Sequence, residues 1–281
     1  MGTVMTPETE PIHNLGVTAR WTAAVRVLEN SRADRLFFDP WAALLAGSEG
    51  HKWINDLSVD SVSPIILRTR YFDDFLQYVA RTKQIHQIVL IAAGLDTRAF
   101  RLSWPEQTQM FELDQASVLD EKEAILKSSS ALPSCNRKTV KTDLTTAWSD
   151  SLMAAGFNPD KPSGWLLEGF LFYVPIEMIT AILSEVSKLA VSSSWLGFDI
   201  MNSISLNHPL TKLWIEMQTK AGAPWIGTMD NPAVFLSEKG WKPKITQAGQ
   251  SDANYGRWPF PVIPTMMPEM PHNWFITAEK S

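Results

Sequence analysis

Residues 87–94 read QIVLIAAG and residues 109–114 read QMFELD. Each stretch is a short apolar run; the first ends at Gly94 and the second at Asp114. Short apolar runs bounded by turn residues are typical of buried parallel strands. Residues 116–127 follow with a helical pattern, so this part of the chain predicts two parallel strands and a helix of an α/β sheet.

The same alternation continues along the chain. Further strands are expected over residues 139–144, 164–169 and 195–200, and helices over residues 149–157 and 175–191. Strands that alternate with helices at this spacing predict a Rossmann-like α/β fold with a mostly parallel sheet.

Both ends of the chain depart from this rhythm. The first 82 residues predict only helices, over 17–29, 40–46 (ended by Gly47) and 64–82. Beyond residue 200, helices are expected over 209–220 and 231–239, and strands over 241–246 and 274–278 that could pair antiparallel at the sheet edge. We therefore expect one domain over residues 1–281, with a helical cap (1–82), a Rossmann-like core (83–200), a lid or substrate region (201–240) and C-terminal strands (241–281).

Composition limits the class of protein. The 281 residues are 45 % apolar and 20 % charged, which is ordinary globular usage. The 25 basic and 30 acidic residues give a net charge of −5 without a basic cluster, which argues against a nucleic-acid partner. Cys135 is the only cysteine, so no disulfide or thiolate metal cluster is expected.

These features favour a cytoplasmic protein with no metal site. The N-terminal residues show no signal peptide, and no run of 18 apolar residues predicts a membrane span. The oligomeric state is left open between monomer and homodimer.

Acidic residues follow the predicted strands, where ligands bind in open parallel sheets. Gly94 would let a ligand approach the backbone, and Asp114 lies 20 residues further on, at the distance of an acid that binds a ribose diol. Asp143 and Leu144 pair a hydrogen-bond acceptor with an apolar side chain, as suits adenine. Glu168 ends the fourth strand, and three acids in one crevice would favour a cationic ligand.

The complete G-x-G-x-x-G fingerprint of dinucleotide-binding proteins is absent, which favours a nucleoside without phosphates. S-adenosylmethionine is such a ligand, being cationic and carrying ribose, adenine and an amino-acid tail. The alternatives are that Gly94 merely ends its strand and that Asp143 merely caps the next helix.

Longer strings carry a family resemblance. They are GVTARWTAAVRVLE (16–29), FFDPWAALLAG (37–47), RTRYFDDFL (68–76), VLIAAGLDTRAFRL (89–102), FELDQASVL (111–119), AAGFNPDKPSGWLLEGFLFYVP (154–175) and WFITAEK (274–280). Together they resemble the leucine carboxyl methyltransferase-like family of S-adenosylmethionine-dependent O-methyltransferases, whose bacterial branch includes polyketide-tailoring enzymes. The resemblance implies a class I methyltransferase sheet with S-adenosyl-L-methionine as cofactor and S-adenosyl-L-homocysteine as product.

The resemblance also implies roles for the residues that match. Gly94 corresponds to a glycine of the family string GAGLDTR, whereas Ala92 replaces its first glycine, so an added methyl would crowd the cofactor tail. By the same match, Asp114 would bind the ribose, Asp143 and Leu144 the adenine, and Glu168 the methionine portion.

Two arginines and two tyrosines lie in matching strings. Arg68 and Arg70 resemble the helical arginine that pairs with the cofactor carboxylate, with Arg68 as the first choice. Tyr71 and Tyr173 would face the crevice or pack in the core, and Arg98 could equally be structural.

Methyl transfer from a sulfonium is a direct displacement, for which positioning and water exclusion supply much of the catalysis. A carboxylate acceptor needs no base, whereas a phenol or alcohol does. His208, and His13 in the N-terminal arm, are candidates for that base, although a histidine before proline is more often a turn residue. Tyr173 is the other candidate catalytic residue.

The acceptor is expected to be a small, largely hydrophobic natural product, polyketide-like in character. Residues 201–226 and 259–271 depart most from the family strings, and they contain Trp214, Trp225, Trp258, Met266 and Met267. Such side chains suit an apolar ligand, or the protein core.

Two alternatives stand beside this reading. A nicotinamide-dependent oxidoreductase is disfavoured by the missing phosphate-binding glycines. A methyltransferase-fold protein that binds the cofactor but catalyses rearrangement or cyclisation, or serves as a binding module, would share every feature above.

Overall fold

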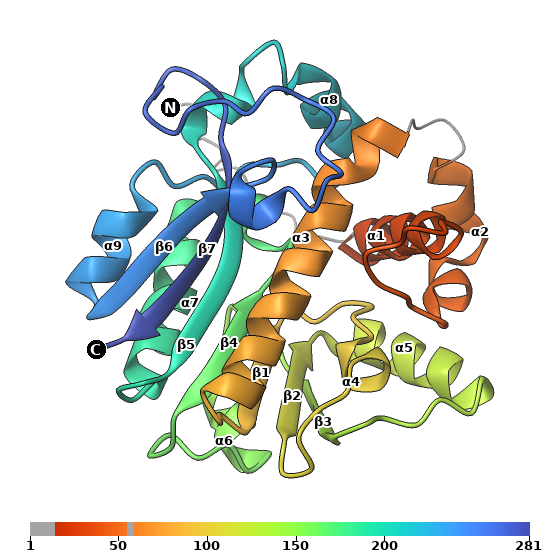
Figure 1. The fold of residues 1–281 in the computed structure, drawn as a ribbon. Coiled ribbons are helices and arrows are strands. Elements are labelled where there is room, and N and C mark those ends of the chain that lie inside the picture. Colours follow the sequence, from red (N-terminus) through yellow and green to blue (C-terminus); the bar gives the residue numbers. More distant parts are fainter. Residues whose placement is uncertain (1–14, 55–58) are drawn as a thin grey trace, which may run out of the picture.

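A seven-stranded sheet forms the centre of the computed structural model, which describes residues 15–54 and 59–281 (Figure 1). The strand order is β3-β2-β1-β4-β5-β7-β6. The strands are β1 (Gln87–Ile91), β2 (Gln109–Asp114), β3 (Asn136–Lys141), β4 (Ser163–Leu167), β5 (Trp195–Met201), β6 (Trp241–Gln247) and β7 (Asn273–Lys280). Strands β1 to β5 are parallel, and β7 runs antiparallel to both β5 and β6.

Helices surround the sheet. They are α1 (Leu15–Asn30), α2 (Ala42–Ile54), α3 (Val59–Gln77), α4 (Arg98–Arg101), α5 (Ala116–Ser128), α6 (Trp148–Ala154), α7 (Ile176–Leu189), α8 (Lys212–Lys220) and α9 (Pro232–Glu238). Short 3-10 turns cover Leu171–Tyr173, Ser203–Leu206 and Ser251–Ala253, and a π-helical turn over Tyr78–Thr82 extends α3.

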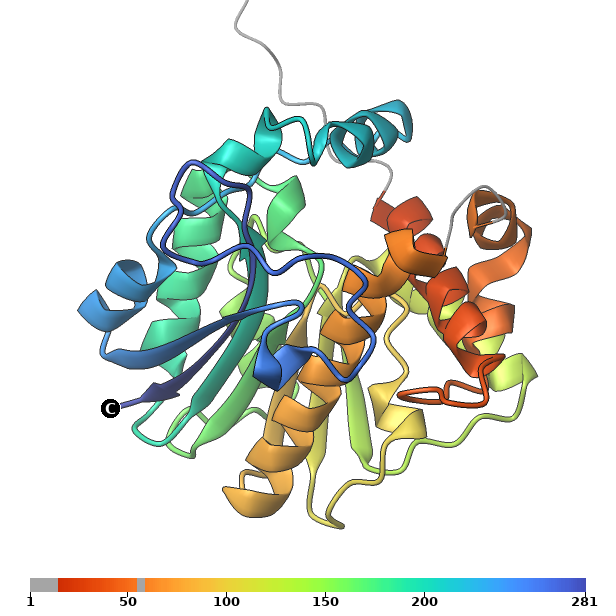
Figure 2. The same ribbon diagram turned by 45° about the horizontal axis from the view of Figure 1, so that its top comes forward.

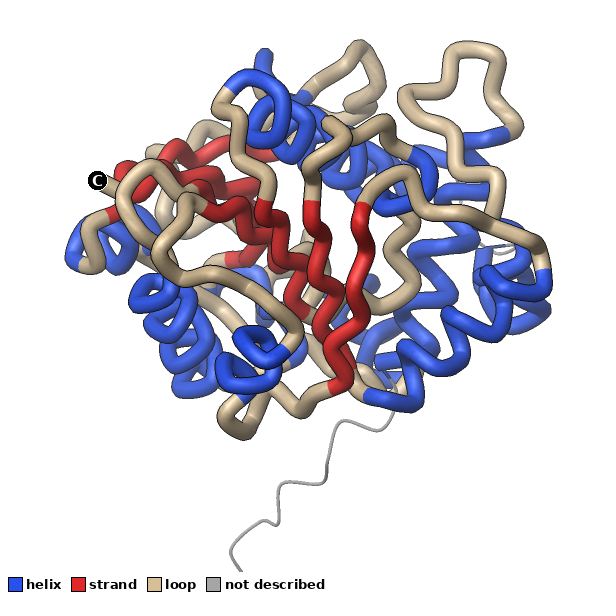
Figure 3. The backbone as a smooth tube through the Cα atoms, turned by 90° about the horizontal axis from the view of Figure 1, so that it is seen from below, coloured by secondary structure: helices blue, strands red, loops and turns tan. Residues whose placement is uncertain are grey.

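The two faces of the sheet carry separate apolar cores. Helices α6, α7 and α9 cover one face, where α7 buries Ile179, Leu183 and Val186 at helical spacing. Helix α3 crosses the other face and buries Phe72 and Leu76 against the strands. Figure 3 shows the strands between the two sets of helices, a three-layer arrangement.

The helical cap packs beside this sheet through small residues. Ala23 and Ala24 of α1 meet Leu45 and Ala46 of α2 in a third core. A Cβ on Gly50 would lie 2.6 Å from the Arg20 carbonyl oxygen, so the two helices approach as closely as a glycine permits. Figure 2 shows this cap and the lid helix α8 at the same end of the molecule, above the carboxyl ends of the parallel strands.

The predicted fold class is confirmed: the sheet is mostly parallel, its C-terminal strands are antiparallel, and helices precede and interrupt it. The edge pairing expected for the last two strands is present, with Phe198 opposite Ile276 and Ile245 opposite the same residue. Strand β7 inserts between β5 and β6.

Three of the differences from the predicted boundaries have a clear physical reason. Strand β3 occupies Asn136–Lys141 rather than 139–144, because this edge strand buries only Val140 and so has little apolar pattern. Helix α3 begins at Val59, five residues before Pro64, and ends in the π-helical turn. Gly47 bends α2 in a left-handed conformation (φ 57°) instead of ending it, and the helix resumes to Ile54.

Candidate functional site

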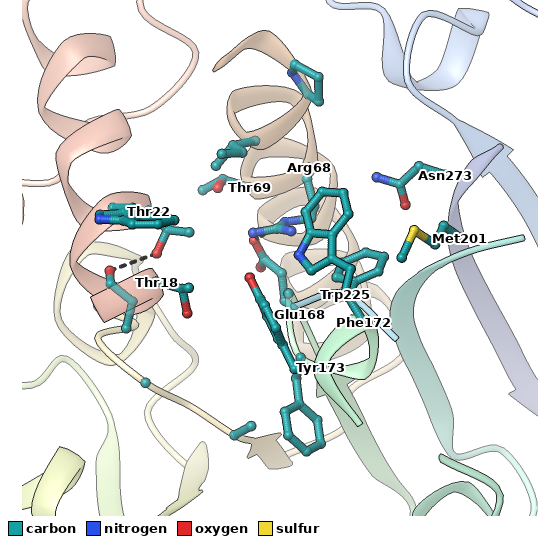
Figure 4. Close-up of a pocket in the computed structure, with 18 of the residues that line it drawn as sticks. Thr18, Thr22, Arg68, Thr69, Glu168, Phe172, Tyr173, Met201, Trp225 and Asn273 are labelled. Atoms are coloured by element: carbon teal, nitrogen blue, oxygen red, sulfur yellow. Dashed lines mark hydrogen bonds and ion pairs between the residues drawn. The ribbon is translucent and has the colours of Figure 1, made fainter. Parts of the chain in front are cut away.

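A cavity of about 1320 Å³ lies at the carboxyl ends of the parallel strands. Single-ligand pockets usually measure roughly 300–1,000 Å³, so this cavity has room for more than one small molecule. Figure 4 shows side chains converging on it from several elements: Thr18 and Thr22 from α1, Arg68 and Thr69 from α3, and Met201 and Asn273 from the ends of β5 and β7.

Asp114 and Gly94 meet at one end of the cavity, as the sequence predicts. The Gly94 N–H donates to Asp114 Oδ2 at 2.7 Å, and the Gln115 N–H donates to Oδ1 at 2.7 Å. Burial raises the pKa of Asp114, against the effect of these two donors. Each carboxylate oxygen keeps a second lone pair, so the group can still accept hydrogen bonds from a diol.

Ala92, which lines the same end, has a left-handed backbone (φ 54°). Residues other than glycine rarely adopt this conformation, because the Cβ approaches the following carbonyl oxygen. Gly94, two residues later, is also left-handed (φ 47°), and a Cβ there would meet the Ala19 Cβ at 3.5 Å. The turn after β1 is therefore built for glycine at both positions and carries alanine at one.

Arg68 and Glu168 form the middle of the site. Arg68 Nε lies 3.1 Å from Glu168 Oε1, and Arg68 Nη1 lies 2.9 Å from Asp199 Oδ2. Burial opposes the charge of Arg68, but Asp199 and Glu168 outweigh it and raise the pKa of the guanidinium. Its Nη2 lies beside Gly169, where a Cβ would come within 2.9 Å of it.

Asp199, a residue that the sequence analysis did not single out, supports this arrangement from inside β5. It is fully buried, and its Oδ1 accepts the Gly169 N–H at 2.7 Å while Oδ2 accepts from Arg68. A carboxylate inside an apolar strand has to be paired, and the run WLGFDI (195–200) holds such a residue. That signal could have pointed to Asp199.

Arg98 has a structural role, the alternative that the sequence analysis left open for it. It is 2 % exposed and contacts Asp73 at 2.6 Å, Glu168 at 2.6 Å and also Asp96. Arg101 binds Asp73 at 2.6 Å. Glu168 is thus shared by two arginines, so it does not offer the free negative charge expected from the sequence.

Asp143 and Leu144 line the cavity, but from a turn after β3. Asp143 is exposed, and its Oδ1 accepts from the N–H (2.8 Å) and the hydroxyl (2.7 Å) of Thr145. Leu144 packs against the core below. Both residues can reach a ligand, although one Asp143 oxygen already stabilises its turn.

Arg70 lies away from the cavity. Its Nε bonds both carboxylate oxygens of Asp74 at 2.9 and 3.0 Å, its Nη1 donates to the Leu36 carbonyl oxygen, and it does not line the site. Arg70 therefore lies on a different face of α3 from Arg68, and the prediction that Arg70 could bind the cofactor carboxylate is corrected.

His208 also does not line the cavity. Its Nδ1 accepts the Leu210 N–H at 3.2 Å, so it closes a turn. Its predicted role as base is corrected in favour of that turn, while His13 lies outside the described residues. Tyr71 belongs to the core, packed on Phe72 and Phe275.

Tyr173 faces the cavity, close to Arg68 and Trp225 (Figure 4). Burial raises the pKa of its phenol, while Trp225, Arg68 and Thr18 near the hydroxyl act in the opposite direction. The group is therefore a neutral hydrogen-bond donor at neutral pH rather than a base.

The other half of the cavity is aromatic. Trp21 stacks on Trp53 with centroids 4.6 Å apart, and Trp214 of α8 lies 6.4 Å from Trp53, so the lid meets the cap through indole rings. On the far side Trp225 packs on Phe172 at 5.3 Å. We call Trp214, Gln218, Trp225, Trp258 and His272 the lid half, and Ala92, Gly94, Asp114, Glu168 and Asp199 with Arg68 the strand-end half.

The chain from 248 to 272 closes the lid half. His272 Nδ1 lies 3.0 Å from Gln247 Oε1 and its Nε2 lies 2.9 Å from the Met267 carbonyl oxygen, and its ring stacks on Trp274. Among the described residues that line the cavity, it is the only histidine. No sequence pattern predicts these two contacts of His272, because the residue follows the irregular loop 259–271.

Within residues 15–54 and 59–281, no helix combines the length and apolarity that a bilayer crossing requires. The same described segments contain no group of three or more His, Cys, Asp or Glu side chains placed to hold a metal ion.

The sequence matches a known protein family. The family model described as leucine carboxyl methyltransferase matches residues 19–187, more than half of the chain. This chain belongs to the leucine carboxyl methyltransferase family. The family resemblance carried by the sequence motifs is thereby confirmed.

Relatives within the family cover nearly the whole chain. A candidate S-adenosyl-L-methionine-dependent methyltransferase of Streptomyces avermitilis is 33 % identical over 268 residues, 90 % of this chain and 93 % of that protein. One from Streptomyces coelicolor is 32 % identical over 274 residues, 92 % and 95 % of the two chains.

Solved structures share the fold at low identity. A candidate methyltransferase from Thermobifida fusca superposes with a TM-score of 0.60 at 14 % identity, covering 98 % of this chain and all (100 %) of that one. A DUF574 family protein from Streptomyces avermitilis gives the same TM-score of 0.60 and 14 % identity, with 92 % and 97 % covered.

Proposed function

We propose that this protein is an O-methyltransferase that transfers the methyl group of S-adenosyl-L-methionine to an oxygen of a small, largely hydrophobic molecule. The observation that carries the proposal is the convergence of Asp114, Arg68, Glu168 and Tyr173 on one cavity that adjoins an aromatic chamber. S-adenosyl-L-methionine is the cofactor of this methyltransferase family, and the single cysteine is in keeping with the reducing cytoplasm.

The strand-end residues fit that cofactor. Asp114 can accept hydrogen bonds from the ribose hydroxyls, since both its oxygens retain a lone pair. Leu144 and Asp143 would meet the adenine. Arg68 lines the cavity with its Nη2 beyond the two carboxylates that hold it, and would pair with the carboxylate of the amino-acid tail.

When bound, the cofactor supplies a methyl group on a sulfonium that an oxygen nucleophile displaces. The protein would orient the acceptor through the neutral phenol of Tyr173, with the aromatic walls excluding water. His272, the one histidine among the described lining residues, is engaged at both ring nitrogens. This favours a carboxylate acceptor, which needs no base, over a hydroxyl.

The test is incubation with isotope-labelled S-adenosyl-L-methionine and a panel of aromatic and aliphatic carboxylic acids and phenols, with mass spectrometry of both products. We expect labelled methyl esters and one S-adenosyl-L-homocysteine per ester. Tyr173→Phe should lower kcat about tenfold or more through the lost donor, with the cofactor Kd unchanged, whereas His208→Asn should leave kcat unchanged.

The alternative functions give different products. A substrate rearranged or cyclised without release of S-adenosyl-L-homocysteine would replace methyl transfer by a reaction that uses the bound cofactor unchanged. A melting temperature that rises with NAD but not with S-adenosyl-L-homocysteine would support the oxidoreductase alternative.

A further inference from the structure

Three buried polar groups of the lid half have no hydrogen-bond partner in the described part of the chain. They are Oε1 of Gln218, Nε1 of Trp258, and Nε1 of Trp225, which lies near the Tyr173 hydroxyl but makes no hydrogen bond of good geometry to it. All three side chains line the cavity, and Gln218 and Trp225 stand seven residues apart in the segment that carries the lid. Buried polar groups in folded proteins are nearly always paired, so two exceptions on one wall indicate a ligand that completes them.

Gln218 lies on the inner face of α8. The residue is 5 % exposed, and Trp214 precedes it by one helical turn on the same face, where both line the cavity. Glu216 and Lys212 occupy the outer face, paired with each other across a turn of the helix. An amide both donates and accepts hydrogen bonds, so a hydroxyl group is its natural complement.

Trp225 presents its indole N–H at the other end of the wall. Its ring packs on Phe172 at 5.3 Å, and its position in Figure 4 places it beside Arg68 and Tyr173. An indole nitrogen can only donate, so its complement is an acceptor oxygen. Among the described residues Trp258 Nε1 also lacks a partner, but a Cβ on Gly249 would lie 2.5 Å from it, so backbone packs directly against that group and leaves it less room for a ligand.

Flat surfaces lie between these two polar ends. Trp21 and Trp53 are parallel within 4°, and Trp214 extends their wall onto the lid. Phe172 and Trp225 form the facing wall with Met201. Aromatic rings pack in offset-stacked or edge-on contacts and lose little conformational entropy, so walls of this kind favour a rigid aromatic ligand over a flexible chain.

We infer that the lid half binds the acceptor as a rigid aromatic acid, with its carboxylate at the Trp225 N–H and a hydroxyl at the far end on the Gln218 amide. The inference rests on the proposed function and narrows its acceptor to aromatic acids that carry a distal hydroxyl. Trp225 then selects the reacting end of the molecule and Gln218 its length and far substituent.

The test uses three probes and isothermal titration calorimetry on the full chain saturated with S-adenosyl-L-homocysteine. They are 6-hydroxy-2-naphthoic acid, 2-naphthoic acid, which lacks the hydroxyl, and decanoic acid, which lacks the rings. We expect the hydroxynaphthoic acid to bind about tenfold more tightly than naphthoic acid, and both to bind more tightly than decanoic acid.

Variants assign the preference to the two groups. Gln218→Met should reduce the preference for the hydroxyl to less than about twofold, whereas Trp225→Phe should weaken both naphthoic acids by about tenfold and keep their ratio. Glu216→Met, on the outer face of the same helix, should change neither value.

The inference is overturned by equal binding of the three acids, by their failure to bind when S-adenosyl-L-homocysteine is bound, or by a Gln218→Met variant that keeps the full preference. Should Gln218→Met not fold, the comparison of probes on the unaltered protein and on Trp225→Phe still decides. A protein that binds the probes but not S-adenosyl-L-homocysteine would refute the proposed function and leave the aromatic site standing.

Discussion

The strand-end half and the lid half of the cavity differ in how their polar groups are paired. At the strand ends, Arg68 bridges Glu168 and Asp199, and Arg98 bridges Glu168 and the acids beside it. In the lid half, Gln218 and Trp225 each leave a buried polar atom without a partner among the described residues. The charges of the strand-end half are paired within the protein, whereas the lid half keeps buried polar atoms that no described residue bonds.

The difference matches what each half has to recognise. A cofactor is the same molecule in every reaction, so its site can be held rigid by a charge network in which each member fixes the next. An acceptor site is better served by apolar walls with few polar groups, because those few groups then decide which molecule is bound. Changes in the network should therefore act on stability and cofactor affinity, and changes in the lid on acceptor choice.

The largest effect is expected from Arg98→Met. This substitution leaves Asp73, Asp96 and Glu168 buried with one cation fewer, and breaking such a network costs about 3–5 kcal/mol. Urea unfolding followed by circular dichroism measures the loss. Arg70→Met is the matched control, because Arg70 and Asp74 are 36 % and 48 % exposed and their pair should contribute about 1 kcal/mol or less. Equal losses in the two variants would contradict the contrast between network and surface.

Asp114→Asn should act on the cofactor rather than on the fold. The amide oxygen can still accept the Gly94 N–H, and the exposed Gln115 N–H, which loses its acceptor, can turn to water. The charge that strengthens hydrogen bonds to a diol is lost, at a cost of about 1.5–3 kcal/mol of S-adenosyl-L-homocysteine affinity. Isothermal titration calorimetry measures this loss. Asp143→Asn, in the exposed turn, should weaken binding less, and the opposite order would misplace the ribose.

Acid should weaken the fold through Asp96. Burial acts to raise the pKa of this carboxyl, but Arg98, Lys122 and Arg101 outweigh it and lower the pKa to about 2 from 3.8. The stabilisation is complete above the unfolded value and is lost as the pH falls toward about 2, a loss of about 2 kcal/mol. Unfolding free energies over this range should fall less in Asp96→Asn. Parallel losses in both proteins would exclude Asp96 as the cause.

Ala92→Gly should have the smallest effect. A left-handed alanine costs roughly 1–2 kcal/mol and the flexibility of glycine roughly 0.5–1, so the variant should gain about 0.5–1 kcal/mol of stability. It should also bind S-adenosyl-L-homocysteine more tightly, because Ala92 lines the cavity where the cofactor would bind. Ser193→Gly, left-handed (φ 66°) but outside the cavity, should gain stability alone. A weaker cofactor complex in Ala92→Gly would show that the methyl group supports binding.

The strand-end half could be predicted from the sequence because the residues that mark it follow directly on apolar runs or lie in family motifs. Gly94, Asp114 and Glu168 stand where an apolar run stops, and Arg68 lies in a motif of the family. It placed β3 three residues too late, since one buried residue, Val140, leaves little pattern in an edge strand. This shift moved Asp143 and Leu144 from a strand end into a turn.

The lid half could not be read in the same way. Composition named Trp214, Trp225 and Trp258 as side chains that suit an apolar ligand, but neither spacing nor composition shows that Gln218 of α8 lines the same cavity. His208 was singled out for its chemistry and proved to close a turn, whereas His272 lines the cavity after a loop without periodicity. Arg70, two residues from Arg68, shows how one helix divides neighbours between site and surface.

The carboxylates of Asp114 and Asp199 each hold the amide of a glycine that follows the neighbouring strand, Gly94 after β1 and Gly169 after β4. The two amide protons therefore take part in hydrogen bonds to carboxylates at the carboxyl ends of the adjacent strands β1 and β4. In a nitrogen-edited NMR spectrum they should resonate at low field and exchange slowly with solvent. The Gly94 amide resonance should shift when a nucleoside binds, and the Gly169 resonance should shift, through Arg68, when an amino-acid tail binds. The spectrum therefore reports separately on the two ends of one ligand.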